Sequence, residues 1–388
     1  MIEKPVYTLR QLMLYFLKLG TVGFGGPVAL VGYMHRDLVE DRKWISEDEY
    51  KQGLALAQLA PGPLAAQLGI YLGFVHYRVL GATLVGLAFV IPSFIMVVLL
   101  GIVYKIYGGL DWMQAVFYGV GAAVIGIIVM SSYKLTTKSI GKFNFESLKQ
   151  RWLLWFYFVA ALVITYVTKQ EKVLLFVVAG LVYMLVKAPP KWFKITSFNM
   201  LLLIPFGILE FKTSVLGKIA LFFTEAGAFV FGSGLAIVPF LHTGVVTKNH
   251  WLTEQQFLDA VAVAMITPGP VVITVGFIGF LVAGFAGACV AALATFFPCY
   301  AFTVLPAPYF NKIAKNESIK AFVDGITAAV VGALVGAVFV IGSQSIKDIP
   351  TAIIAIVAAL ALIYFKKIQE PYIILISAII GVVLKFVF

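Results

Sequence analysis

Charged residues are scarce in this sequence, and their scarcity argues against a soluble protein. Asp, Glu, Lys and Arg make up only 12% of the 388 residues, whereas 61% of the residues are hydrophobic. A soluble domain is about 25% charged. Apolar runs long enough to cross a bilayer recur along the whole chain, and such runs are typical of membrane helices. We therefore predict an all-α polytopic membrane protein.

Cysteine and nucleotide-binding motifs are also scarce. The two cysteines, Cys289 and Cys299, both fall in apolar stretches, so the sequence offers neither a disulfide framework nor a metal cluster. No GxxxxGK[ST] motif occurs, which argues against a nucleotide-driven pump. The segment Met1 to Arg10 leads into an apolar stretch without an A-x-A-like cleavage site, and we expect no cleaved signal peptide. We expect no cofactor, no metal and no nucleic acid partner.

Histidine is too scattered to indicate an enzyme. A membrane enzyme acting on lipid intermediates would need a cluster of carboxylates or histidines near one face of the membrane. The sequence has four histidines, which are spread over both halves: His35, His76, His242 and His250. We therefore predict a protein without catalytic residues.

The second half of the chain resembles the first. The segment from Phe16 to Gly69 recurs without a gap as the segment from Phe223 to Gly276. The shared residues include Gly20 and Gly227, Phe24-Gly25 and Phe231-Gly232, His35 and His242, Trp44 and Trp251, Glu47 and Glu254, and Pro61-Gly62-Pro63 and Pro268-Gly269-Pro270. After a slip of one residue the pairing continues with Gly81 and Gly287, Pro92 and Pro298, Gly119 and Gly325, and Gly126 and Gly332.

Such a duplication is typical of transporters that are built from two repeats. We predict that repeat one covers 1–195, that 196–216 is a linker or a short crossing helix, and that repeat two covers 217–388. About 12–13 membrane segments are expected in all. They lie near 11–34, 53–75, 79–104, 112–133, 152–168, 173–187, 198–211, 218–241, 256–282, 285–305, 321–343, 350–365 and 371–388.

Basic loops indicate the topology of the two repeats. Cytoplasmic loops of membrane proteins carry an excess of Lys and Arg. In repeat one the basic loops contain Lys142 and Lys191, and in repeat two they contain Lys315 and Lys367. All four loops are cytoplasmic only if segment 198–211 crosses the membrane, and that crossing inverts repeat two relative to repeat one. We therefore favour inverted repeats. The net charge of +11 has this same explanation, or else it concentrates anionic substrates.

Two Pro-Gly-Pro motifs interrupt apolar segments at equivalent positions. Proline in a helix interior costs about 3 kcal/mol and removes a backbone donor, so Pro61-Gly62-Pro63 and Pro268-Gly269-Pro270 should break their helices. Proline is well tolerated at a first helical position, and we expect Pro63 and Pro270 to begin new half-helices. The N-terminus of a half-helix inside the membrane directs free N–H groups and partial positive charge at its surroundings. This arrangement suits an anion.

Glycine clusters produce a second pair of predicted breaks, in the first segment of each repeat. Irregular backbone at membrane depth is tolerated only inside the protein or beside a wet cavity. The alternative is a structural kink with small-residue helix packing. Four breaks in two symmetric pairs favour a substrate site between the repeats. The residues predicted to bind substrate are Lys18, Gly25, Gly26, Pro61, Gly62, Pro63, Gly232, Ser233, Gly234, Thr267, Pro268, Gly269 and Pro270.

Few charges lie inside the apolar segments. Lys18 of repeat one aligns with Glu225 of repeat two, and an ionisable residue within a membrane segment is a functional candidate by default. Lys18 would add positive charge beside the anion, and Glu225 would bind and release a coupling proton. Alternatively, the two charges neutralise each other, or Lys18 extends to the interface. His35 and His242 would join a proton path or would simply be solvated at the interface.

The sequence resembles the chromate transporter family. The motifs that carry the resemblance are Phe16-Leu17-Lys18-Leu19-Gly20, Phe24-Gly25-Gly26-Pro27, Gly32-Tyr33, Trp44, Pro61-Gly62-Pro63, Phe229-Val230-Phe231-Gly232-Ser233-Gly234-Leu235-Ala236, Trp251-Leu252-Thr253-Glu254 and Met265-Ile266-Thr267-Pro268-Gly269-Pro270. They cover about 10–130 and 215–340. The resemblance implies the two-domain form of the family, an inner-membrane carrier of a prokaryote that exports chromate, driven by membrane potential or a proton gradient.

The leading hypothesis is therefore secondary transport of a divalent oxyanion, most simply chromate efflux. The alternatives are an uptake carrier for sulfate or another anion, and a passive anion channel that uses the same helix ends. The expected partners are the oxyanion and the lipid bilayer, and the formation of a homodimer is left open.

Overall fold

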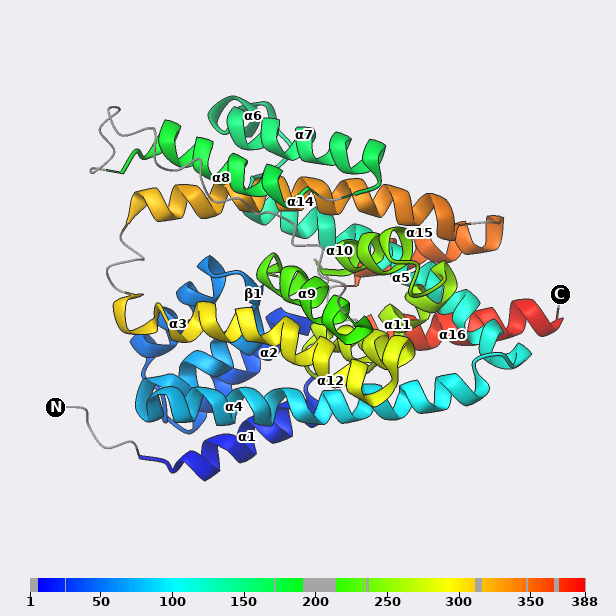
Figure 1. Ribbon diagram of the computed structural model, residues 1–388, viewed down its shortest axis with the longest axis horizontal. Coiled ribbons are helices and arrows are strands. Elements are labelled where there is room, and N and C mark those ends of the chain that lie inside the picture. Colours follow the sequence, from blue (N-terminus) through cyan, green and yellow to red (C-terminus); the bar gives the residue numbers. More distant parts are fainter. Residues whose placement is uncertain are drawn as a thin grey trace.

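The computed structural model describes residues 6–24, 26–170, 172–190, 214–232, 234, 237–310, 316–346, 348–365 and 370–387. Within these ranges almost the whole chain is helical, and most helices run along the long axis of the molecule (Figure 1). Four described helices are long and apolar enough to cross a membrane, and shorter apolar helices accompany them. The predicted segment 198–211 and the basic residues Lys191, Lys315 and Lys367 lie outside the described residues.

The main helices of the two halves follow one another in the same order, whereas strand β1 follows α3 and strand β2 follows α9. The first half contains α1 (Leu9–Val22), α2 (Gly26–His35), η1 (Arg36–Asp41), α3 (Glu47–Leu59), β1 (Gly62–Pro63), α4 (Leu64–Tyr107), α5 (Asp111–Ser139), α6 (Phe145–Gln150), α7 (Trp152–Thr168) and α8 (Val173–Lys187). The second half contains α9 (Val215–Ala228), β2 (Phe231–Gly232), α10 (Ile237–His242), η4 (Thr243–Lys248), α11 (Glu254–Ile266), η5 (Val271–Ile273), α12 (Thr274–Val304), η6 (Ala307–Tyr309), α14 (Glu317–Ser345), α15 (Ile349–Tyr364) and α16 (Glu370–Val387).

Local sequence signals fix the starts of the helices that lead into the Pro-Gly-Pro motifs. Helix α3 begins with a capping box in which Ser46 and Glu49 satisfy each other's backbone donors. Helix α11 begins with the same device, made by Thr253 and Gln256. Because a capping box satisfies two orphan N–H groups reciprocally, it sets the first residue of a helix. The two halves therefore begin these helices at equivalent positions.

Helices α4 and α12 each fold back on themselves as tight hairpins. Helical geometry is interrupted at Arg78 (φ 52°) in α4 and at the equivalent Gly284 (φ 63°) in α12. In α4, a Cβ atom added to Gly81 would clash with the Gly73 carbonyl, and Gly287 and Gly279 repeat this contact in α12. Only glycine permits backbones to approach so closely. The glycine pairs that the two halves share therefore close the hairpins.

Helices α4 and α12 pack against each other in opposite directions. The Thr83 hydroxyl shares a hydrogen bond of 2.7 Å with the Tyr300 hydroxyl. Further along α4, the Phe94 ring lies 6.3 Å from the Phe285 ring, which comes earlier in α12. As the chain advances in α4, its neighbours in α12 therefore retreat. Equivalent helices of the two halves are antiparallel where they pack.

The last helices of each half pack on the other half. Helix α5 of the first half contacts α15 and α16, whereas α14 of the second half contacts α7 and α8. Glycines permit these contacts, because a Cβ atom at Gly126 would meet the Ala355 carbonyl and one at Gly332 would meet the Phe158 carbonyl. Small residues of this kind let membrane helices approach closely. The two halves are thus interlocked.

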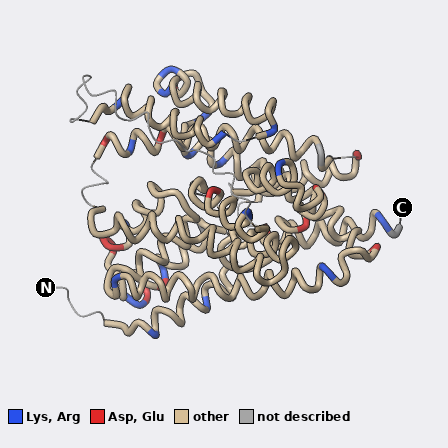
Figure 2. Tube along the Cα trace, viewed as in Figure 1, with Lys and Arg blue, Asp and Glu red and all other residues tan. Residues whose placement is uncertain are grey.

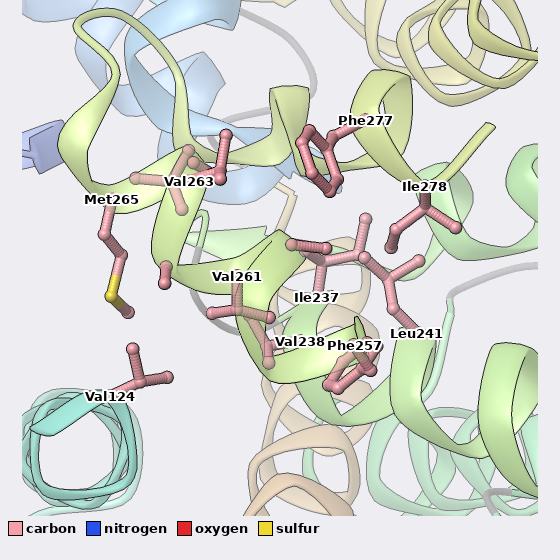
Figure 3. Close-up of a cluster of buried hydrophobic side chains, with 14 of the residues drawn as sticks. Val124, Ile237, Val238, Leu241, Phe257, Val261, Val263, Met265, Phe277 and Ile278 are labelled. Atoms are coloured by element: carbon pink, nitrogen blue, oxygen red, sulfur yellow. The ribbon is translucent and has the colours of Figure 1, made fainter. Parts of the chain in front are cut away.

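Apolar side chains fill the interior, and few charged residues lie among them. Figure 3 shows part of the core of the second half, where Met265 of α11 faces Val124 of α5. The other labelled side chains around it come from α10, α11 and α12: Ile237, Val238, Leu241, Phe257, Val261, Val263, Phe277 and Ile278. Figure 2 shows long stretches of these helices without Asp, Glu, Lys or Arg. This distribution is what a membrane protein requires.

Candidate functional site

The Pro-Gly-Pro motifs break their helices. Helix α3 ends at Leu59 and α4 begins at Leu64, with Pro63 as the N-cap at φ −67° and ψ 113°. In the second half, Pro270 is likewise the N-cap, here of η5. The prediction of helix breaks is confirmed, but both prolines precede the first helical residue and do not occupy it. Their extended ψ explains this shift, because an N-cap has non-helical dihedral angles.

The glycine clusters also interrupt helices. Helix α1 ends at Val22 and α2 begins at Gly26, which has φ +71°. In the second half, α9 ends at Ala228 and α10 begins at Ile237. The intervening segment contains Gly232 in strand β2 and a buried Gly234. The predicted site residues Gly25 and Ser233 lie outside the described residues.

Each Pro-Gly-Pro turn contacts the glycine break of the other half. The Gly62 amide donates a hydrogen bond of 2.5 Å to the Val230 carbonyl, and strands β1 and β2 pair in parallel. The equivalent Gly269 amide donates a hydrogen bond of 3.0 Å to the Gly23 carbonyl. The breaks that the sequence places far apart therefore meet in two crosswise pairs, which are related by the internal symmetry.

Both central glycines are irreplaceable in this packing. Gly62 has φ +145° and Gly269 has φ +96°, a backbone conformation that residues with a side chain rarely adopt. A Cβ atom at Gly62 would clash with Gln67, and one at Gly269 would clash with the Ser93 hydroxyl. Dihedral angle and close packing therefore both require glycine.

The first carbonyl of each Pro-Gly-Pro turn accepts a hydrogen bond, but the donor differs between the two halves. In the first half, the Pro61 carbonyl accepts a hydrogen bond of 2.8 Å from Nε2 of Gln67. In the second half, the Pro268 carbonyl accepts a hydrogen bond of 2.7 Å from Oγ of Ser93, which belongs to α4 of the first half. Ser93 also lies 3.3 Å from the Gly20 carbonyl. One donor is thus local, whereas the other ties the halves together.

Polar side chains beside the turns are already engaged with the backbone. The Thr267 hydroxyl donates to the Val263 carbonyl, and the Thr274 hydroxyl donates to the Val271 carbonyl. Within the described part of the chain, Oε1 of Gln67 is buried without a hydrogen-bond partner. Backbone N–H groups at the half-helix ends are therefore better donors for an anion than these hydroxyls.

The two predicted intramembrane charges do not pair. Lys18 lies on an exposed position of α1, and Glu225 lies on an exposed position of α9. Among the described residues, no ion pair joins them. Mutual neutralisation therefore does not account for the two charges in this conformation.

The shared histidines bind the shared glutamates. Nε2 of His35 lies 2.9 Å from Oε2 of Glu47, and Nε2 of His242 lies 2.7 Å from Oε2 of Glu254. The hydrogen bond from His35, with a further one from Lys51, lowers the pKa of Glu47. His242 is buried, so the alternative of a solvated interfacial histidine is wrong at that position. Each pair ties the end of one half-helix to the start of the next.

Sequence reasoning missed two carboxylates. Oε2 of Glu370, at the start of α16, lies 3.5 Å from where a Cβ atom of Gly26 would be. Asp259 is buried on α11, with 3% of its surface exposed. The signal for Asp259 was available, since it stands just before the apolar run from Ala260 to Ile266. No local signal indicates that Glu370 faces a glycine from the other end of the chain.

A cavity of about 770 Å³ lies between α4, α9 and α12. Its walls are almost entirely apolar, and they include Leu87, Ile91, Leu293 and Phe297, which are exposed on the surface of the chain. Neither Pro-Gly-Pro turn lines it. Both central glycines of the turns are buried, so this conformation closes them to solvent.

Comparison with known proteins identifies the family. The model of the chromate transporter family matches residues 10–185 and 217–382, which correspond to the two similar halves. The chain belongs to the chromate transporter family. The match confirms the resemblance, and it confirms a transporter rather than an enzyme. No solved structure matches the chain.

Curated relatives match this family member over nearly its whole length. The chromate transport protein of Cupriavidus metallidurans is 61% identical over 98% of this chain and 94% of its own length. The probable chromate transport protein of Synechococcus elongatus is also 61% identical, over 98% of this chain and 96% of its own. The chromate transport protein of Pseudomonas aeruginosa is 29% identical over 94% of this chain and 89% of its own. This chain is thus a multi-pass membrane transporter of the two-domain form of the family.

Proposed function

We propose that this transporter exports chromate from the cytoplasm across the inner membrane of a prokaryote. The names of the relatives support chromate as the substrate. The observation that carries the proposal is the crosswise pairing of the four helix breaks, in which Gly62 contacts Val230 and Gly269 contacts Gly23. This pairing gathers the ends of half-helices from both halves around the internal symmetry axis.

The anion binds where these half-helix ends converge. Chromate is a tetrahedral dianion, and backbone N–H groups at helix N-termini suit such a charge. The N-terminus of α4 follows Pro63, and the N-terminus of α2 includes Gly26. Glu370 adds negative charge beside Gly26, so a proton on this carboxylate would favour the anion.

Alternating access comes from rocking of one inverted repeat against the other. The antiparallel packing of α4 and α12 supports the inversion, because these helices are equivalent in the two halves. The hydrogen bonds of the Gly62 and Gly269 amides to the other half support a pivot at these turns, about which the two repeats would rock. In the conformation described here the turns are buried, so one side of the protein must open before an anion reaches them.

Coupling to a proton gradient runs through a carboxylate, and Glu225 is the candidate that the sequence indicates. Lys18 would add positive charge beside the bound anion. Glu225→Gln should abolish the pH dependence of chromate flux and leave chromate binding largely unchanged. The measurement is flux into reconstituted vesicles over a pH series, with binding followed by titration calorimetry. A wild-type pH profile in this variant would assign Glu225 a structural role.

Uptake of chromate and sulfate into vesicles separates this proposal from its alternatives. Internal and external pH and the membrane voltage are set independently, and labelled anions are followed. Movement of chromate against its gradient, driven by pH or voltage, supports a secondary transporter. Movement only down the gradient indicates a passive channel, and a strong preference for sulfate indicates a sulfate carrier.

A further inference from the structure

A buried carboxylate joins the two halves away from the helix breaks. Oδ2 of Asp259 accepts a hydrogen bond of 2.6 Å from the Tyr104 hydroxyl. Oδ1 accepts a hydrogen bond of 2.9 Å from Nε2 of Gln255, one turn earlier on α11. Tyr104 belongs to α4 of the first half, whereas Asp259 belongs to α11 of the second. This carboxylate therefore ties the long helix of one repeat to the half-helix that enters the Pro-Gly-Pro turn of the other.

Among the residues that the structure describes, no cation forms an ion pair with Asp259. The elements that pack on α11 include α4, α5, α12, α14, α16, η4 and η5. Among the described residues of these elements, Tyr104 is the titratable group that acts on the Asp259 carboxyl, and no ion pair includes Asp259. The centroid of the Tyr104 ring lies 5.5 Å from the ring centroids of both Phe117 and Phe277. A buried ionisable group without a counter-ion is a functional candidate in a membrane protein.

The first half has no carboxylate at the equivalent position. Gln52 stands there, and the Tyr71 hydroxyl lies 3.4 Å from its Oε1. An amide cannot bind and release a proton in the physiological range. The halves share their histidine–glutamate pairs and their turns, so Asp259 is a point where the symmetry of the transporter is broken. A single titratable group on one repeat lets a proton act on one repeat and not on the other.

We propose that Asp259 binds a proton that transport requires in addition to the one assigned to Glu225, and that its contact with Tyr104 makes the relative position of the repeats depend on that proton. The inference rests on the transport function proposed above. The ionised carboxylate holds Tyr104 by a charge-assisted hydrogen bond, which is about twice as strong as a neutral one. A proton from the aqueous phase that binds at Oδ2 removes this charge and weakens the hold of α11 on α4. Because α11 ends at Ile266, just before Pro268-Gly269-Pro270, a shift of α11 would also move this helix break.

Infrared spectroscopy tests the proton site without any transported anion. The purified full chain in lipid is titrated with pH, and the carbonyl stretch of protonated carboxyl groups is followed. Asp259→Asn should remove one titrating band, whereas Glu225→Gln should retain it. If the Asp259→Asn spectrum keeps every titrating band of the wild type, Asp259 does not exchange a proton and the proposal is overturned.

Flux measurements test the coupling. Asp259→Asn should lose the pH dependence of chromate flux while still carrying chromate down its gradient. Tyr104→Phe keeps the carboxyl but removes the donor to its ionised form, so its pH profile and its infrared titration should both shift to higher pH. A wild-type profile in either variant overturns the coupling role.

Two controls keep the outcomes separate. If Asp259→Asn fails to fold, Tyr104→Phe still decides the question, because an unshifted titration in that variant excludes the proposed link. If wild-type vesicles carry no chromate, the proposed function fails, whereas the infrared titration still reports on Asp259. Gln52→Glu serves as the matched change in the first repeat, and it should leave the titrating band of Asp259 in place.

Discussion

At the scale of single residues, the crosswise contacts depend on a few residues that the packing does not allow to be replaced. Gly62 and Gly269 adopt positive φ angles and face Gln67 and Ser93 at contact distance. Ser93 donates to a carbonyl of the other half, whereas Gln67 donates within its own half. The two turns are therefore equivalent in position, but the donors that bind their carbonyls come from positions that are not equivalent.

Gly269→Ala should abolish chromate flux and lower the amount of folded protein in the membrane. The new methyl group would clash with Ser93, and φ +96° is unfavourable for alanine. Gly32→Ala is the matched control, because a methyl group there meets no atom within 4 Å. Flux and size-exclusion profiles of both variants check the prediction. Equal behaviour of the two variants would contradict the packing described here.

Ser93→Ala should lower the free energy of unfolding by about 1–3 kcal/mol, because the buried Pro268 carbonyl loses its donor. Ser132→Ala is the control, since this buried serine donates only to the Ile128 carbonyl of its own helix. Thermal and chemical unfolding in detergent measure both changes. The idea of a link between the halves would be lost if Ser132→Ala were the more destabilising of the two.

At the scale of elements, the two helical hairpins both need a positive φ angle at their bends, but different residues adopt it. Arg78 and Gly284 occupy equivalent bends with positive φ, but only the second is glycine. The close glycine pairs on either side hold each bend in place. Strain at Arg78 is thus imposed by the packing of the hairpin.

Reciprocal substitutions at the bends should have opposite effects. Gly284→Ala adds a methyl group that meets no atom within 4 Å, so its destabilisation of about 1–3 kcal/mol would come from the backbone alone. Arg78→Gly relieves the same strain and should raise the unfolding temperature. Unfolding curves of the two variants are compared with that of the wild type. A stabilising Gly284→Ala or a strongly destabilising Arg78→Gly would show that φ does not limit these bends.

At the scale of the whole molecule, the proposed alternating access requires the interlocked halves to move relative to each other. The last helices of each half pack on the other half, and α4 packs antiparallel to α12. An inverted pair of repeats gives two equivalent ways to open, one toward each side of the membrane. The contacts at Ser93 and at Asp259 then lie between the parts that would move.

Cysteine labelling tests the inversion. Single cysteines replace Gly109, Lys142 and Lys315 in a chain whose Cys289 and Cys299 are changed to serine. Lys142 and Lys315 should label from the cytoplasmic face, and Gly109 should label from the opposite face because α5 crosses between it and Lys142. Labelling of Lys142 and Lys315 from opposite faces would exclude inverted repeats.

The sequence by itself determined the class of the protein, the internal duplication and the places where helices break. Those features depend on local physics, since apolar runs, proline and glycine act through their own backbone and solvation. It also identified the shared histidines and glutamates, although not their pairing. The relation of the two repeats in the membrane stays a prediction.

Only the tertiary structure decided which break meets which. The partners Gly62 and Val230 or Gly269 and Gly23 are far apart in the chain, and no local pattern links them. The same holds for Ser93 and for the contact of Asp259 with Tyr104, because hydrogen bonds between distant segments depend on how the helices pack. The packing also revealed that the last helices of each half lie against the other half, which the repeat in the sequence does not show.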